Sequence, residues 1–431
     1  MQVIEQNNRS VLFIGFVWPE QTATAASQNI LSYVRALKHA GFTVHFACAA
    51  QRSLLSTPLE AHDIVAHQIA LNCDSFDTFV QDLAPDIVVF DRFLTEEQFG
   101  WRVIKSAPEA LRVLDLEDLH FLRQGRHMLY KAMGYQPRQA HYLNTNAIFE
   151  PGHEQYAYNA LTTRELACVY RCDLNISLSE PERDILIKHF HVPSENIAHV
   201  PYLLNEDIAA SAMKNPSTSS MPRTDFVSIG NFRHAPNIDA VNVLLQHIWP
   251  SIFARLPRAK CRIYGAYLPP KIQQLHQPKR GIYIHGHIPD HLHMLSSAKV
   301  LLAPIQFGAG VKGKIVDALR CALPSITTSI GVEGITYSQW PGAVVNTRDE
   351  FIEAAINTYN CEQDFTALAH DILHTNFIAT QPQQKFVEAV ETALDHKAKR
   401  RIGNFMQQML SHHTVQTHQY MSQWIQAKNA D

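Results

Sequence analysis

The sequence has few charged residues and no marked excess of either sign. Lysine and arginine number 37 against 40 aspartates and glutamates, the net charge is −3, and charged residues make up only 18% of the chain. A dedicated nucleic-acid-binding protein normally carries a strong basic excess, so we expect no nucleic-acid partner. The hydrophobic fraction of 46% is ordinary for a folded protein, which excludes a chain dominated by intrinsic disorder.

Signatures of oxidising compartments and of membrane spans are also missing. The seven cysteines show no paired Cys-x-x-Cys spacing, and seven in 431 residues do not make a disulfide framework. No apolar run approaches the roughly 18 residues that cross a bilayer. The apolar stretch at 11–17 is too short and too poorly flanked for a signal peptide. We therefore expect a soluble cytoplasmic protein of two or three domains.

A repeating alternation of strands and helices runs through the sequence. Short apolar runs at 11–16, 43–48 and 87–90 have the composition of strands, and residues 27–40 carry apolar side chains at helical spacing. Strand, helix, glycine and strand in this order form a βαβ unit. Uninterrupted apolar strands are what a parallel sheet covered on both faces requires. The predicted fold class is therefore α/β, with doubly wound sheets.

The alternation is interrupted by a stretch rich in serine, proline and threonine. Residues 209–223 show no periodicity, which is typical of a linker. We expect a first Rossmann-like domain at 1–208, a second at 224–395, and a helical tail at 396–431 that could pack back on the first domain. Open sheets bind ligands at the carboxyl ends of their strands, so two facing domains would enclose a cleft between two sets of loops.

A glycine-rich loop lies between a strand and a helix predicted in the second domain. The segment VLLAPIQFGAGVKGKIVDALR (300–320) contains three glycines and two lysines at this junction. Backbone N–H groups and the positive end of a helix dipole attract an anion there. We predict a phosphate or diphosphate site, with charge from Lys312 and Lys314 and with Asp317 accepting hydrogen bonds from ribose hydroxyls. A tight turn with solvated lysines is the alternative.

A cluster of acidic residues ends a predicted strand in the first domain. Glu117 and Asp118 follow the strand at 111–115, and His120 comes shortly afterwards. Functional side chains gather on loops at strand ends in α/β folds. We predict that these three residues face the cleft as catalytic groups. The alternative is a helix start with acids that favour its dipole.

The segment FGAGVKGKIVDALRCALPSITTSIGVEGI (307–335) resembles the C-terminal signature of the group 1, or family 4, retaining glycosyltransferases. SIGNFRHAPNIDAVNVLL (228–245) is similar to the opening of the same family's second domain. WPEQTATAASQNI (18–30) and LRVLDLEDLHFLR (111–123) look like its acceptor-side loops. The resemblance implies the GT-B fold, in which two Rossmann-like domains face a central cleft. It also implies a hexosyltransferase-type enzyme that moves a sugar from a nucleoside diphosphate sugar to an acceptor hydroxyl with retention.

The resemblance further implies roles for individual residues. Asp317 occupies the ribose-binding position of the family's two acids, whereas Ala309 stands at the other acidic position. Asn231 and Pro236 stand where the family has its diphosphate-neutralising Arg and Lys, and Glu117 stands where it often has a histidine. The expected donor-binding residues are Gly230, Asn231, Arg233, His285, His287, Gly308, Ala309, Gly310, Val311, Lys312, Lys314 and Asp317, and the expected acceptor-side residues are Trp18 and Ser27.

For the remaining motifs, metal and redox sites are less favoured than donor contacts and helix packing. The chain has no Asp-x-Asp motif placed to hold a metal-bound diphosphate, so we expect metal-independent catalysis without a cofactor. IHGHIPDHLH (284–293) could ligate zinc, but contacts with the donor's base or ribose are favoured. Cys168 and Cys172 lie one turn apart on a predicted helix, which favours a packed face over a redox pair.

Three alternatives stay open at this point. A sugar-nucleotide epimerase of the same fold would isomerise its substrate without an acceptor, and a non-catalytic relative would bind without turnover. The basic run HKAKRR (396–401) either touches anionic lipid, as a peripheral membrane contact, or is a solvated helix end. The acceptor, whether glycan, lipid, protein or small molecule, is not fixed by any pattern in the sequence.

Overall fold

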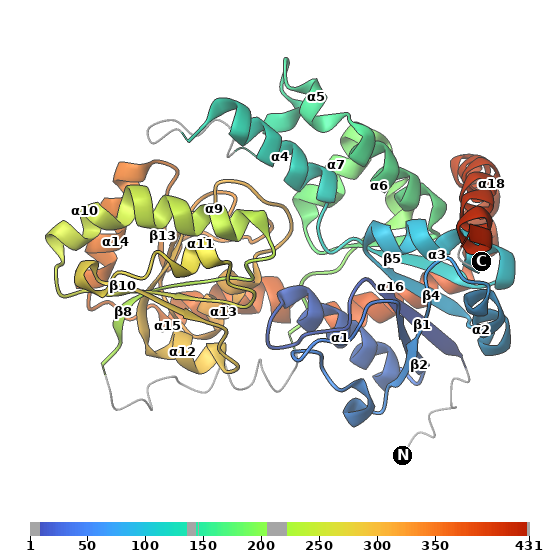
Figure 1. Cartoon of the computed structure of the whole chain (residues 1–431), viewed down its shortest axis with the longest axis horizontal. Coiled ribbons are helices and arrows are strands. Elements are labelled where there is room, and N and C mark those ends of the chain that lie inside the picture. The colour runs from blue at the N-terminus through green and yellow to red at the C-terminus, as the bar shows by residue number, and fades with distance from the viewer. Residues whose placement is uncertain (1–8, 136–143, 145, 205–221, 429–431) are drawn as a thin grey trace.

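Two parallel β-sheets form the centres of the two halves of the molecule (Figure 1). The computed structural model describes the chain apart from residues 1–8, 136–143, 145, 205–221 and 429–431. The linker predicted at 209–223 lies almost entirely outside the described residues.

The first sheet has seven strands in the order β3-β2-β1-β4-β5-β6-β7. Its strands are β1 (Ser10–Gly15), β2 (Thr43–Cys48), β3 (Val65–Gln68), β4 (Ile87–Asp91), β5 (Leu111–Asp115), β6 (Leu174–Ser177) and β7 (Ile197–His199). Its helices are α1 (Ala25–His39), α2 (Ser75–Leu83), α3 (Arg92–Ser106), α4 (His120–Met133), α5 (Glu154–Ala157), α6 (Ala160–Arg171) and α7 (Glu180–Phe190).

The second sheet has six strands in the order β10-β9-β8-β11-β12-β13. Its strands are β8 (Thr224–Ile229), β9 (Cys261–Tyr264), β10 (Ile282–Gly286), β11 (Ala298–Ala303), β12 (Ser325–Thr327) and β13 (Gly342–Val344). The helices of this half are α9 (Ala235–Val243), α10 (Trp249–Arg255), α11 (Pro270–Gln273), α12 (His291–Ser297), α13 (Gly313–Arg320), α14 (Arg348–Asn360) and α15 (Thr366–Leu373).

Burial explains why the strands lack polar alternation. The residues of β1 from Val11 to Ile14 are completely buried, because helices cover both faces of the sheet. Every strand pair in both sheets is parallel, and β1 pairs with β2 on one side and with β4 on the other. The strand order reverses between β1 and β4 in the first sheet and between β8 and β11 in the second. Ligands bind beside such reversals in open α/β sheets.

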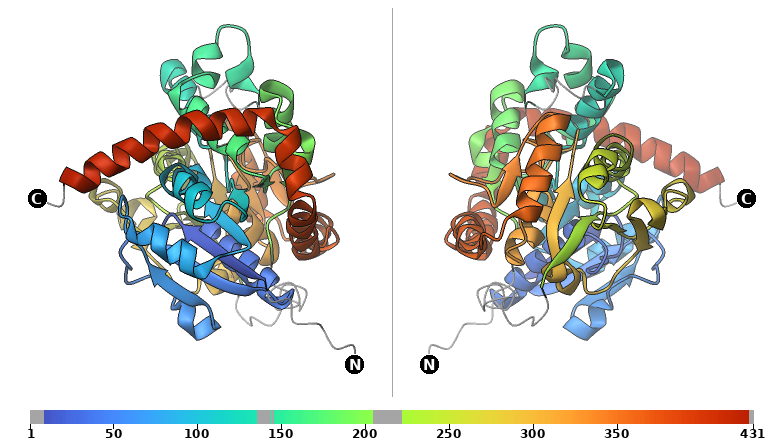
Figure 2. Two further views of the ribbon diagram at one scale, coloured as in Figure 1. Left: turned by 90° about the vertical axis from the view of Figure 1, so that its right-hand side faces the viewer. Right: turned by 90° about the vertical axis from the view of Figure 1, so that its left-hand side faces the viewer.

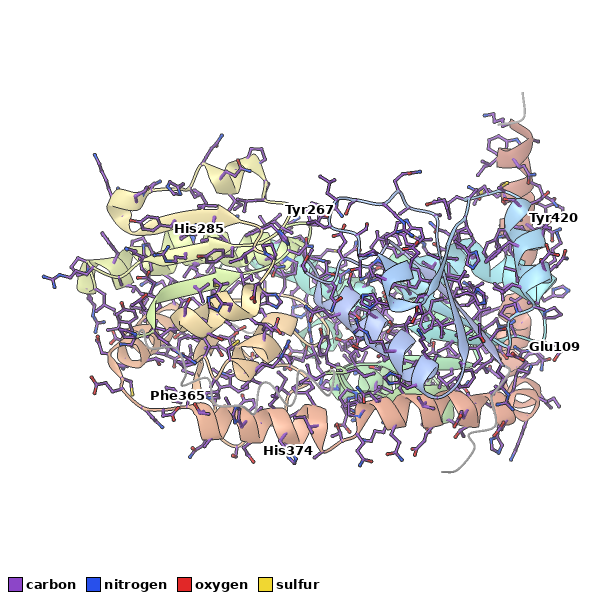
Figure 3. The ribbon with its side chains drawn as sticks, turned by 90° about the horizontal axis from the view of Figure 1, so that it is seen from below. Glu109, Tyr267, His285, Phe365, His374 and Tyr420 are labelled. Atoms are coloured by element: carbon purple, nitrogen blue, oxygen red, sulfur yellow. The ribbon has the colours of Figure 1, made fainter. Side chains whose placement is uncertain are left out.

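The C-terminal helices return to the first sheet. They are α16 (Pro382–Asp395), α17 (Lys397–Gly403) and α18 (Phe405–Lys428). Helix α16 runs from the second half back to α1, where the rings of Phe386 and Tyr33 stack with their centroids 4.2 Å apart (Figure 3). The domain boundary predicted at 395 thus falls at the end of a helix that already lies against the first half. Arg401 donates to Asp173 at 2.7 Å, so part of the basic run 396–401 anchors the tail.

Candidate active site

A cavity of about 380 Å³ lies between the two halves, at the carboxyl ends of both sheets. On one side it is lined by the loops that follow β1, β4 and β5. On the other side it is lined by the loops after β8 and β11 and by the beginning of α13. Both strand-order reversals therefore face this one cavity, which is the arrangement expected of a ligand site in two facing α/β sheets.

Most of the residues predicted for the site line this cavity. They are Glu117, Asp118 and His120 from the first half, and Gly230, Asn231, His287, Gly308, Ala309, Gly310, Val311, Lys312, Lys314 and Asp317 from the second. The structure therefore brings the predicted catalytic cluster and the predicted donor loop together.

Arg233 and His285, two predicted donor-binding residues, do not line the cavity. The guanidinium of Arg233 lies 3.5 Å from the ring centroid of Tyr267, in a cation–π contact. The ring of His285 stacks on Tyr264, with centroids 4.7 Å apart. Both side chains are thus held by neighbouring aromatic residues.

Trp18 and Ser27, the two predicted acceptor-side residues, also lie outside it. Trp18 is buried, and its indole N–H donates to the carbonyl oxygen of Ala50 at 2.7 Å. Ser27 is buried in the first turn of α1, where its backbone N–H donates to the Thr24 hydroxyl that caps the helix. Packing and capping account for these two residues.

The acidic cluster has a constrained backbone. Glu117 has a φ of 57° and Arg92, at the end of β4, has a φ of 68°, both in the left-handed region. The backbone N–H of Glu117 donates to the carboxylate of Asp115 at 3.2 Å. Non-glycine residues held in this region are costly and gather at functional sites. Arg92 lines the cavity and was missed by the sequence analysis, although it lies two residues after the strand predicted at 87–90.

The surroundings give the neighbouring acidic side chains different pKa values. Burial raises the pKa of Glu117 to about 7. The charge of Arg92 opposes this rise, whereas the carboxylates of Asp91 and Asp118 support it. Burial also disfavours ionised Asp118, but the opposing charges of Arg123 and Arg92 outweigh it and lower its pKa to about 2. Asp118 is therefore ionised at neutral pH, whereas Glu117 exchanges its proton there. Such a separation is typical of acid–base and charge-stabilising roles.

His120 is held neutral beside this pair. Burial lowers the pKa of His120 to about 4, so its imidazole carries no charge at neutral pH. Its Nε2 lies 3.5 Å from Asp118 Oδ1. His234, another cavity residue that the sequence analysis missed, has a pKa lowered to about 4 by burial and by the charges of Arg123 and Arg92.

Two glycines let the donor loop approach the first half closely. Gly310 has a φ of 68°, and a Cβ there would lie 2.9 Å from Asp118 Cβ. A Cβ on Gly313 would lie 2.4 Å from the Cβ of Ala25, at the start of α1. Real Cβ atoms do not come this close, so the contact between the loop and the acidic cluster requires glycine.

The two lysines of this loop are enclosed, so the alternative of solvated lysines is wrong. Lys312 Nζ donates to the Gly310 carbonyl at 2.6 Å and lies 3.6 Å from Glu333 Oε2. Lys314 Nζ donates to Asn237 Oδ1 at 2.7 Å. Burial lowers both pKa values, that of Lys314 to about 8. Lys312 thus braces the loop, whereas Lys314 retains a charge at neutral pH beside the cavity.

Asp317 lies in the second turn of α13 and faces the cavity. Arg320 donates to its Oδ1 at 2.7 Å, and His291 Nε2 lies 3.0 Å from its Oδ2. These two partners hold the carboxylate in place at the cavity wall. Among the described residues, no group of three or more His, Cys, Asp or Glu side chains is arranged to hold a metal ion. Cys168 and Cys172 are both buried and free.

The sequence of the second half matches a known family. Residues 223–360 match the family model described as "Glycosyl transferases group 1". These residues are a group 1 glycosyltransferase domain. The resemblance carried by 228–245 and 307–335 is thereby confirmed for this domain, and with it the predicted class of enzyme, a glycosyltransferase. No curated protein matches the chain by sequence.

Solved structures, among them a glycosyltransferase, share the fold of the chain. A glycosyltransferase from Rickettsia africae ESF-5 has a TM-score of 0.61 at 11% identity, and the match covers 90% of this chain and 99% of that one. Anabaena Alr3699/HepE in complex with UDP and glucose has a TM-score of 0.61 at 14% identity, covering 89% and 100%. TarM has a TM-score of 0.62 at 9% identity, covering 91% and 99%. The predicted GT-B fold is confirmed, including its helical C-terminal region.

No helix within the described part of the chain is both long and apolar enough to cross a bilayer.

Proposed function

We propose that the protein transfers a sugar from a nucleoside diphosphate sugar to an acceptor hydroxyl, with retention of configuration and without a metal ion. The observation that carries the proposal is the single cavity that joins the glycine loop, Lys314 and Asp317 to the buried acidic cluster around Glu117. The similar Anabaena protein has been solved with UDP-glucose, which supports a sugar nucleotide as the donor.

The second half binds the donor in this proposal. The Asp317 carboxylate, held by Arg320 and His291, accepts hydrogen bonds from the ribose hydroxyls. Lys314 and the first N–H groups of α13, which have no partners within the helix, bind the diphosphate. They stabilise the negative charge that develops on the leaving phosphate. These groups supply the positive charge that a divalent cation would otherwise provide, which is the reason for proposing a metal-independent reaction.

The first half stabilises the sugar during transfer. The bond between the anomeric carbon and the phosphate oxygen breaks, and the acceptor oxygen bonds to that carbon on the same face. The acceptor proton passes to the leaving phosphate. Ionised Glu117 stabilises the positive charge on the oxocarbenium-like sugar, as a carboxylate does in glycoside hydrolysis. Enclosure of the cavity by both halves keeps water from the donor.

A donor panel tests this function. The purified protein is incubated with UDP-, GDP-, ADP- and CMP-linked sugars and a mixture of glycan and lipid acceptors, in Mg²⁺ and separately in EDTA. We expect release of one nucleoside diphosphate at equal rates in both buffers, and a product whose anomeric proton coupling in NMR matches the donor's configuration. An inverted product or a requirement for Mg²⁺ would contradict the corresponding part of the proposal.

A non-catalytic nucleotide-binding module is the second candidate. It is favoured by Ala309, which lines the cavity where the resemblance implies a sugar-contacting acid. Such a module binds the nucleotide but releases no product from any donor. An epimerase would instead isomerise the donor with no acceptor present, so the donor panel repeated without acceptors separates all three functions.

A further inference from the structure

The C-terminal helices carry an unusual number of exposed apolar side chains. Ile402, Phe405, Met406, Met409, Tyr420, Met421 and Trp424 have exposed fractions of at least 40%. They are seven of the 14 large hydrophobic residues that are exposed in the described part of the chain. We call this set, carried by α17 and α18, the tail surface. Isolated exposed apolar residues are normal, but a gathered set marks an interaction site.

Helix α18 is turned with its polar side toward the protein. Gln407 and Ser422 are buried, and the Gln407 side chain donates to the Arg171 carbonyl at 3.0 Å. Arg102 donates to the Ser422 hydroxyl at 3.0 Å. A surface helix of a globular protein normally turns its apolar side to the core, so the orientation of α18 is inverted. Figure 2 shows α18 running along the outside of the first half.

The exposed apolar residues of α18 share one side of the helix. At 3.6 residues per turn, Phe405, Met409, Tyr420 and Trp424 fall within about a third of the circumference, away from the positions of Gln407 and Ser422. Figure 3 places Tyr420 at the outer margin of the molecule. On this side the apolar residues form two groups, Phe405 with Met409 near the start of the helix and Tyr420 with Trp424 near its end.

The charge of this region is opposite to that of the rest of the chain. Residues 396–428 contain no Asp or Glu, and carry Lys397, Lys399, Arg400, Arg401 and Lys428. This segment therefore has a formal charge of +5, and the rest of a chain of net charge −3 has −8. Lys399 is exposed, and Lys428 Nζ lies 4.5 Å from the ring centroid of Trp424. Lys397 and Arg401 pair with Glu109 and Asp173 of the first half, so the exposed Lys399 and Lys428 are the cations that flank the tail surface at its two ends.

We propose that the tail surface docks on an anionic lipid membrane and holds the protein at its surface. A second copy of the chain would bring two positively charged segments together, whereas anionic headgroups neutralise them. Trp424 and Tyr420 have the apolar ring and polar tip favoured at the headgroup level of a bilayer. Cations beside an exposed apolar stripe are typical of helices that lie in the membrane interface. The proposal concerns a surface outside the cavity and does not depend on the proposed function.

Vesicle co-sedimentation of the full chain tests the proposal. Vesicles of phosphatidylcholine alone are compared with vesicles that contain phosphatidylglycerol as well. We expect binding to the anionic vesicles that is at least about tenfold tighter than to the neutral ones, and that weakens as salt is raised. Equal binding to both vesicle types, or no binding to either, would overturn the proposal.

Variants distinguish binding through the tail surface from non-specific adsorption of the protein to vesicles. Phe405→Ser combined with Trp424→Ser removes two rings from the apolar side, and Lys399→Glu reverses one exposed charge. Each should weaken vesicle binding about tenfold or more, with an unchanged melting temperature. Leu54→Ser is the matched control, because Leu54 is fully exposed on the first half, outside the tail surface, and its loss should change nothing.

The oligomeric state tests the rival occupant of the tail surface, a second copy of the chain. Analytical ultracentrifugation without lipid should show a monomer over the concentrations used for sedimentation. A dimer that Phe405→Ser/Trp424→Ser dissociates would overturn the proposal and assign the tail surface to a second copy of the chain. Undiminished vesicle binding by that variant would also overturn it.

Discussion

Glu117 and Asp118 are neighbours in the chain, but they meet different charges in the fold. Asp118 accepts a hydrogen bond from Arg123 and lies beside His120, and these positive or polar partners keep its carboxylate ionised. Glu117 is buried, and the carboxylates of Asp91 and Asp118 offset the charge of Arg92 beside it; the left-handed backbone at this residue turns it to the cavity. Its pKa of about 7 makes Glu117 a cavity-lining carboxyl group whose protonation changes in the neutral range.

Replacement of Glu117 by glutamine tests its charge. Because burial raises its pKa from 4.5 to about 7, the residue is neutral below pH 7 and ionised above. If the ionised form stabilises the sugar cation, kcat/KM of the native enzyme rises as the pH increases through about 7. Glu117→Gln should lower kcat/KM by about 100-fold or more and remove this rise. A variant that keeps the same pH profile would show that another group titrates.

Asp317 is predicted to act on nucleotide affinity instead of turnover. Asp317→Ala removes a carboxylate that accepts hydrogen bonds from ribose, worth about 1.5–3 kcal/mol, and should weaken nucleoside diphosphate binding about tenfold or more. Asp371→Ala is the matched control, because Asp371 is exposed on α15, outside the cavity. Isothermal titration calorimetry measures both. Equal affinities of the two variants would refute the ribose contact.

Individual site residues could be predicted from the sequence where they follow a predicted strand or a glycine-rich loop. Glu117 and Asp317 belong to this group, and both line the cavity. Arg92 obeys the same strand-end rule but was overlooked. Trp18 and Ser27 were chosen by resemblance of a loop, and the structure buries them because local capping and packing use their polar groups. Which side of a loop faces the cavity depends on contacts distant in sequence.

At the scale of elements, Lys312 and Lys314 look equivalent in the sequence but make different contacts in the structure. Lys312 donates to the loop's own backbone at Gly310 and lies near Glu333. The hydrogen bond described for Lys314 goes to the side chain of Asn237 in α9. The pattern Val-Lys-Gly-Lys indicates two cations near an anion. The packing of the two halves determines which of them remains available to a ligand.

The pH dependence of diphosphate binding distinguishes these lysines. Burial lowers the pKa of Lys314 from 10.5 to about 8, so its ammonium loses its proton as the pH rises through about 8. We expect the Kd of the nucleoside diphosphate to increase between pH 7 and pH 9. Lys314→Met should weaken binding at pH 7 and flatten this dependence, whereas Lys312→Met should lower the melting temperature instead. An unchanged pH dependence in Lys314→Met would contradict the assignment.

Regular elements were predicted well because their signals are local. The strand predicted at 43–48 is β2, and the helix predicted at 27–40 is α1, which begins at Ala25 because Thr24 caps it. The orientation of α18 could not be predicted, since its polar side faces the protein and its apolar side does not. Periodicity locates an amphipathic side, but it does not say which surroundings that side meets.

At the scale of the whole molecule, a buried ion pair joins the two halves. Arg126 of α4 donates to both carboxylate oxygens of Glu333 at 2.8 Å and to the Gly308 carbonyl at 2.6 Å. Both side chains are almost completely buried. The sequence separates these residues by 207 positions, so no local pattern could pair them. The contact fixes the donor loop against the first half and thereby shapes the cavity.

Breaking this pair should destabilise the closed arrangement. Arg126→Met leaves the Glu333 charge without its main partner, and such losses cost about 3–5 kcal/mol of unfolding free energy. Arg126→Met combined with Glu333→Leu removes both charges and should be more stable than the single variant. Urea denaturation measures the stabilities, and small-angle scattering should show a larger radius of gyration in Arg126→Met. A single variant as stable and compact as the native protein would refute the role of the pair.

The central claim is that the cavity between the halves binds a nucleoside diphosphate donor. Calorimetric titration with UDP, GDP, ADP and CMP, first in EDTA and then with Mg²⁺, tests it most directly. The account predicts that one nucleoside diphosphate binds with a Kd on the order of micromolar, equally with and without metal, and that Asp317→Ala weakens this binding. The absence of binding by all four nucleotides, or binding that Asp317→Ala leaves unchanged, would contradict it.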